Sequence, residues 1–146
     1  MSLSLFFILP LAVTALAQTS KSGCAVVTLN EVTAMLGPGT EQKDVSGICI
    51  FTSQKTSVTI TLTANASAPF QIMRITANQN GATVKDEPGI GVPAFSIVGK
   101  DGHGYSIFLL KGTWGASVSA DTGTAKVPDP VRERLRGLAK KAAGRM

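Results

Sequence analysis

The sequence predicts an α+β domain with an antiparallel sheet of about five strands, a hairpin plus a three-stranded meander, and about three helices. Three observations predict this class: short segments in which every second residue is apolar, other segments with apolar residues at helical spacing, and glycine-containing turns between them. The length of 146 residues is that of one domain with a buried core. The order helix, hairpin, helix, meander, helix also indicates a loose two-fold internal duplication, although no residue-level repeat accompanies it.

The first predicted helix has clear signals at both ends. Thr28 and Glu31 form a capping-box pattern at its start, and Gly37 followed by Pro38 ends it after Leu36. The polar residues that follow, 38–47, predict a loop.

Two strands are predicted next. Residues 48–52 are mostly apolar, and residues 57–64 alternate strictly between apolar and polar side chains. The polar face of the second strand carries Thr59, Thr61 and Thr63, so this strand is expected to bury only its other side.

The second half of the chain predicts a helix, a meander and a closing helix. Ser67 and Pro69 begin a helix that runs to about residue 80, with Phe70, Met73 and Ala77 at three- and four-residue spacing. Three strands are expected at residues 94–98, 105–111 and 114–120. The closing helix has Asp129 as its N-cap and Pro130 at its first position, and its apolar stripe comprises Val131, Leu135, Leu138, Ala139 and Ala142.

The N-terminus predicts export. Residues 3–17 are apolar and uncharged, and Ala15-Leu16-Ala17 is the small-x-small pattern that signal peptidases cleave. We therefore divide the chain into a signal peptide, residues 1–17, and one secreted or periplasmic domain, residues 18–146. The alternative is an uncleaved anchor, although this segment is shorter than the roughly 20 residues that span a bilayer.

The two cysteines, Cys24 and Cys49, are expected to form a disulfide in an oxidising compartment, with two free thiols as the alternative. A bridge of this spacing stabilises the fold by roughly 3 kcal/mol in the chain-entropy model. A metal site is not expected, because two cysteines and the single histidine fall short of the four ligands of structural zinc.

Several segments also resemble a known family. Residues 24–32 read Cys-Ala-Val-Val-Thr-Leu-Asn-Glu-Val, residues 36–37 Leu-Gly, residues 49–51 Cys-Ile-Phe, residues 89–94 Gly-Ile-Gly-Val-Pro-Ala and residues 111–112 Lys-Gly. This pattern resembles a family of exported proteins and lipoproteins of unknown function that is common in actinobacteria. It departs where Val92-Pro93 replace the family's Asp-Ala and where a signal-peptidase site replaces its lipidated cysteine. The resemblance implies an envelope-exposed α+β domain with paired cysteines, and it brings no catalytic residues.

Catalytic candidates are few. His103 lies in a glycine-flanked turn, which positions a general base poorly, so a hydrolase that uses His103 is the second alternative function. Asp86 and Glu87 are adjacent and are expected in a solvated loop. Gly89-Ile90-Gly91 lacks the remaining spacing of a phosphate-binding loop and predicts a turn, so no nucleotide or other cofactor is expected.

The closing helix concentrates the positive charge of the chain. Residues 129–146 hold four of the five net charges. The cations form a candidate basic patch: Arg132, Arg134, Arg136, Lys140, Lys141 and Arg145. Two interpretations are open. Either the aliphatic parts of these side chains lie along the flanks of the apolar stripe while the helix packs on the sheet, or the cations contact an anionic envelope polymer, a membrane surface or an acidic partner. Nucleic acid is not expected, because no aromatic residues interleave with this run.

We therefore predict an exported, non-catalytic binding domain whose partner is an unidentified protein or envelope component. The first alternative is association with anionic envelope components through the basic helix. A second candidate surface is the threonine face, which Ser117 and Ser119 would extend if the two strands share a sheet.

Overall fold

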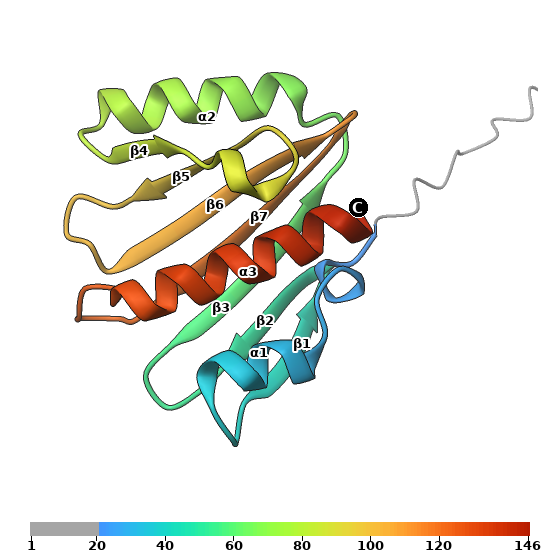
Figure 1. Cartoon of the computed structure of the whole chain (residues 1–146), viewed down its shortest axis with the longest axis vertical. Coiled ribbons are helices and arrows are strands. Elements are labelled where there is room, and N and C mark those ends of the chain that lie inside the picture. The colour runs from blue at the N-terminus through green and yellow to red at the C-terminus, as the bar shows by residue number, and fades with distance from the viewer. Residues whose placement is uncertain (1–20) are drawn as a thin grey trace, which may run out of the picture.

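The computed structural model describes residues 21–146, which form a seven-stranded antiparallel sheet and three α-helices (Figure 1). The elements in chain order are η1 (Gly23–Ala25), α1 (Leu29–Leu36), β1 (Glu41–Val45), β2 (Ile48–Thr52), β3 (Ser57–Thr63), α2 (Ser67–Gln79), β4 (Thr83–Asp86), η2 (Pro88–Ile90), β5 (Ala94–Val98), β6 (Gly104–Lys111), β7 (Trp114–Asp121) and α3 (Asp129–Arg145). The strands lie in the order β1-β2-β3-β7-β6-β5-β4. The predicted α+β class, three helices and antiparallel sheet are confirmed. The predicted number of strands, about five, is wrong, and the predicted signal peptide, residues 1–17, lies outside the described residues.

The two additional strands, β1 and β4, are the edges of the sheet. The polar segment 38–47, predicted as a loop, contains β1, whose five residues are all exposed and which pairs only with β2. β4 pairs only with β5 and has one half-buried residue, Val84. Because neither strand buries a full face, neither shows the alternation that reveals a strand in a sequence. The turn from β1 to β2 has positive φ at Ser46 and Gly47, 53° and 85°, as two-residue type I′ hairpins require.

The α1 capping box is present as predicted. The Thr28 amide donates to Glu31 Oε2 at 3.0 Å, and the Glu31 amide donates to Thr28 Oγ1 at 3.3 Å. α3 begins differently from the prediction: Pro128 is its N-cap and Asp129 its first helical residue, without a side-chain capping bond. Proline is compatible with this position because an N-cap residue has extended backbone angles.

One face of the sheet carries the main core, and we call it the α3 face. α3 crosses this face, and α1 packs beside it (Figure 1). The predicted apolar stripe of α3 lies against the sheet, with Val131 half-buried and the rest buried. The sheet contributes the alternate residues of four strands, all at most 5% exposed: Cys49, Phe51, Val58, Ile60, Tyr105, Ile107, Leu109, Ala116, Val118 and Ala120.

The opposite face, the α2 face, has a smaller core at its β4 end. α2 packs there against β4, β6 and β7. Phe70 of α2 contacts the buried Phe95 of β5 edge to face, with ring centroids 4.8 Å apart, and Phe95 stacks on Phe108 of β6 at 5.2 Å. Three aromatic rings therefore fix α2 over one half of this face.

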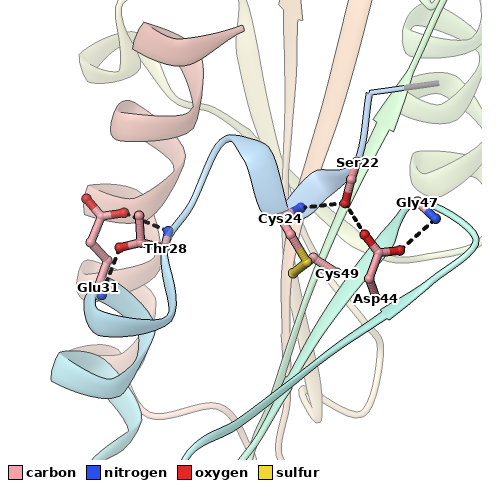
Figure 2. The surroundings of a disulfide bond; sticks show 7 residues. All are labelled: Ser22, Cys24, Thr28, Glu31, Asp44, Gly47 and Cys49. Atoms are coloured by element: carbon pink, nitrogen blue, oxygen red, sulfur yellow. Dashed lines mark hydrogen bonds between the residues drawn. A yellow bond between two sulfur atoms is a disulfide. The ribbon is translucent and has the colours of Figure 1, made fainter. Parts of the chain in front are cut away.

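The predicted disulfide is present and joins η1 to β2 (Figure 2). The Cα atoms of Cys24 and Cys49 are 5.0 Å apart, within the usual range for a bridge. The Ser22 hydroxyl accepts from the Cys24 amide and donates to Asp44, which also accepts from the Gly47 amide at 2.9 Å. η1 is thus attached to the first hairpin by one covalent bond and a chain of hydrogen bonds.

Candidate functional site

The predicted basic patch on α3 is largely engaged within the fold. Arg145 forms a two-pronged ion pair with Glu31 of α1, at 2.7 and 2.8 Å, and also donates to the Val26 carbonyl at 3.1 Å. Lys141 approaches the same carboxylate at 3.2 Å. Hydrogen bonding from Arg145 is the main cause that holds the pKa of the Glu31 carboxyl far below its usual value. These two cations connect the end of α3 to the start of α1.

Arg136 connects the middle of α3 to the segment before η2. Its Nε donates to Glu87 at 2.9 Å, and Glu87 also accepts from the Tyr105 hydroxyl at 3.0 Å. Glu87 is only 8% exposed, so its expected position in a solvated loop is wrong. Burial alone would raise the pKa of Glu87, but hydrogen bonds from Arg136, Ser96 and Tyr105 together outweigh it and keep the pKa below its usual value.

The other cations of the patch differ in their surroundings. Arg134 donates to the Met35 carbonyl at 3.0 Å, and the Arg132 guanidinium lies 5.5 Å from the centre of the Tyr105 ring. Lys140 is exposed. Five of the six predicted patch residues therefore contact other parts of the described chain, and their charges attach α3 to α1, η2 and β6.

Within the described residues, no hydroxyl group is hydrogen-bonded to the imidazole ring of His103. Its Nδ1 lies 3.5 Å from Asp101, but the neighbouring Thr122 hydroxyl donates to the His103 carbonyl oxygen rather than to the ring. A nucleophile needs its hydroxyl hydrogen-bonded to the imidazole.

The other acidic and glycine candidates of the sequence have structural surroundings. Asp86 forms an ion pair with Arg74 at 2.8 Å. Gly91 has a φ of 93°, which fits the turn that the sequence predicts there.

The threonine face forms a continuous hydroxyl surface with Ser117 and Ser119, because β3 and β7 are neighbours in the sheet. Thr59 lies opposite Ser119, and Thr61 lies opposite Ser117. Ile50 of β2 lies beside Thr59 on the same face. We call these five residues the shelf. All are half-buried, and they lie on the α2 face, on the half that α2 leaves uncovered.

α2 forms an apolar wall beside the shelf. Three of its large apolar side chains are exposed, Ile72 at 62%, Ile75 at 57% and Met73 at 40%. A groove of about 210 Å³ runs between helix and shelf, with Met73, Phe70 and Pro69 on one side and Thr61 and Ser117 on the other. Met73, which has helical spacing with Phe70 in the sequence, lines this groove.

Exposed apolar side chains therefore gather on the α2 face. Of the six large apolar residues exposed in the described chain, three are those of α2, and Val45 and Ile48 lie at the end of the first hairpin. Ile48 alternates with the buried Cys49 and pairs with Val45, so both lie on the α2 face. Only Leu29 lies elsewhere, on α1. Sequence reasoning missed this surface because the outward isoleucines of α2 follow no pattern that distinguishes them from core residues.

Comparisons with protein-family models, with curated proteins and with solved structures find no match to this chain. Within residues 21–146, no group of metal-binding side chains comes together. None of the helices in this range combines the length and the apolar character needed to cross a membrane.

Proposed function

We propose that this protein is an exported, non-catalytic interaction domain that binds its partner through the α2 face. The observation that carries the proposal is that, within residues 21–146, five of the six exposed large apolar side chains lie on that face. Large apolar side chains that gather on one exposed face of a protein are a common mark of an interaction site. The shelf adds hydroxyl groups that orient a partner without placing a charge in the centre of the contact.

Export remains part of the proposal. The disulfide is compatible with an extracellular or other oxidising compartment. The signal peptide and the resemblance to exported actinobacterial proteins both come from the sequence alone. Together they place the proposed partner in the cell envelope, as a protein or another envelope component.

The two-part organisation predicted from the sequence is also a proposal. Its support is topological, since a helix followed by three antiparallel strands occurs on each side of β7 in the sheet, α1 with β1-β2-β3 and α2 with β4-β5-β6. An interaction domain built from two such units would explain why the second helix leaves half of its face uncovered.

The test is recovery of partners from envelope extract with immobilised mature protein. Thr61→Arg places a long charged side chain in the middle of the shelf, and Ala34→Arg places the same group on the exposed side of α1. We expect Thr61→Arg to abolish recovery of any partner bound by the wild type, and Ala34→Arg to retain it. Thermal unfolding measured by circular dichroism verifies that both variants are folded. Equal recovery by Thr61→Arg and wild type would reject the α2 face as the binding surface.

A further inference from the structure

The α2 face consists of a ridge and a shelf side by side. The ridge is α2 itself, which presents Pro69, Ile72, Met73 and Ile75 away from the sheet core. The shelf lies on the neighbouring strands and is bordered by the apolar hairpin end at Val45 and Ile48. One half of the face is therefore raised by the helix, and the other half is uncovered.

A raised half and an uncovered half of the same face can complement each other in two copies of the chain. A contact between identical chains with two-fold symmetry uses the same surface twice, so each feature must meet its complement on the other copy. A two-fold axis along the groove would place the α2 ridge of each copy on the shelf of the other. The small serine and threonine side chains of the shelf allow the helix to approach the sheet closely.

Charge also favours a second copy as the partner. The chain has a net charge of +5, which opposes self-association through most of its surface. Arg74 is the one charged residue of α2, and Asp86 neutralises it at 2.8 Å. No charged side chain belongs to the shelf. The charges on this half of the face stand at its margins, Glu41 and Lys43 on β1 and Asp121 at the end of β7, and they include both signs.

The dimensions fit a dimer better than a small ligand. The groove of about 210 Å³ is smaller than the roughly 300–1,000 Å³ of typical small-molecule sites. α2 has 13 residues, which gives a ridge about 20 Å long, and the symmetry uses the ridge contact twice. Using the contact twice doubles the area buried by one helix, which helps the interface to reach the roughly 1,000 Å² in total that separates specific association from incidental contact.

We propose that two copies of this chain form a face-to-face dimer in which α2 of each copy lies on the shelf of the other. This inference rests on the proposed use of the α2 face and names its occupant. The contact buries Ile72 and Ile75 of both copies, and it completes the helix layer that each sheet lacks.

The first experiment measures the mass of the oxidised mature protein by sedimentation velocity over a concentration series. We expect a species of twice the chain mass, and we expect Ile72→Glu and Ser117→Lys each to convert it to a folded monomer. Leu29→Glu is the matched control, because Leu29 is the one exposed large apolar side chain of the described residues that lies outside the α2 face. This control should stay dimeric.

A mixture of the two interface variants tests the geometry directly. In a mixed dimer, the glutamate on the ridge of one copy meets the lysine on the shelf of the other, while the second ridge and shelf retain wild-type side chains. We therefore expect the mixture to recover the dimer that each variant alone has lost, and failure to recover it would reject the ridge-on-shelf arrangement.

A wild type that remains monomeric at its highest soluble concentration would reject the dimer. If Thr61→Arg then still loses its partner from envelope extract, the proposed function stands with a different occupant. A dimer that Ile72→Glu leaves intact would assign the interface to another surface and would also overturn the inference.

Discussion

Glu87 illustrates how a single residue can connect distant parts of this fold. It lies just before η2, is nearly buried, and binds Arg136 of α3 and Tyr105 of β6 at once. A buried carboxylate is unfavourable unless hydrogen bonds and a counter-charge compensate it. The hydrogen bonds and the counter-charge of Arg136 are both present at Glu87. The carboxylate therefore favours the native position of α3 over other placements of this helix on the sheet.

We expect Glu87→Gln to destabilise the protein by about 2 kcal/mol, because it removes the charge of the nearly buried carboxylate that pairs with Arg136 and leaves Arg136 only its exposed partner, Glu133. Glu133→Gln is a matched control: Glu133 pairs with the same Arg136, but its side chain is 71% exposed, and exposed pairs contribute at most about 1 kcal/mol. Urea unfolding at neutral pH measures both changes. Equal losses for the two variants would show that burial of Glu87 does not strengthen its contribution.

At the scale of elements, the sequence was informative wherever an element buries one face. The strict alternation at residues 57–64 predicted β3, and the capping residues Thr28 and Glu31 predicted α1. The edge strands β1 and β4 could not be predicted, because an edge strand with both faces wet has the composition of a loop. Met73 has helical spacing with Phe70, yet only Phe70 is buried, since spacing identifies a helix better than it identifies the buried side.

The position of η1 depends on the absence of a side chain at Gly23. A Cβ atom there would lie 2.2 Å from the Ile60 carbonyl oxygen and 3.3 Å from the Cys49 nitrogen. We therefore expect Gly23→Ala to push η1 away from the sheet, to lower stability by about 2 kcal/mol or more, and to leave a fraction of Cys24 and Cys49 unpaired.

Thiol titration under denaturing conditions, combined with thermal unfolding, measures both effects of Gly23→Ala. Gly89→Ala is the control, because a Cβ atom at Gly89 would meet nothing within 4 Å. If Gly23→Ala forms the disulfide fully and unfolds at the wild-type temperature, the tight packing of η1 does not contribute to the stability of the fold.

For the whole molecule, the concentration of positive charge on α3 was predicted from the sequence, but the residues with which these charges pair were not. The concentration of cations on α3 is visible in the sequence, whereas their acceptors lie far away in the chain, Glu31 at a separation of 114 residues from Arg145 and Glu87 at 49 from Arg136. Pairings at such separations depend on the topology of the sheet, which local patterns do not determine. Likewise, the hydroxyl face was visible in the alternation at residues 57–64, but the uncovered state of this face depends on where α2 packs.

The ion pairs of Glu31 with Arg145 and of Glu87 with Arg136 predict that the whole fold is sensitive to acid. The pKa of Glu31 is lowered mainly by its hydrogen bonds with Arg145, and the pKa of Glu87 is also below its usual value, so both carboxylates bind protons more weakly in the folded chain than in the unfolded chain. A lowered carboxyl pKa contributes stability that is fully present above the unfolded value, about 4.3 for glutamate, and is lost as the pH falls toward the folded value. The pKa of Asp44, an exposed residue, is also lowered, because its carboxylate accepts hydrogen bonds from the Ser22 hydroxyl and the Gly47 amide.

We therefore expect the urea midpoint of the wild type to be constant near neutral pH and to fall steadily below about pH 4.5. The double variant Glu31→Gln, Glu87→Gln should have a lower urea midpoint at neutral pH, because it lacks both ion pairs. Its midpoint should fall less on acidification, because it lacks both protonation sites. Asp44 is unchanged in this variant and accounts for the residual slope. Parallel curves for the two proteins from neutral pH to pH 3 would mean that carboxylates other than Glu31 and Glu87 govern acid unfolding.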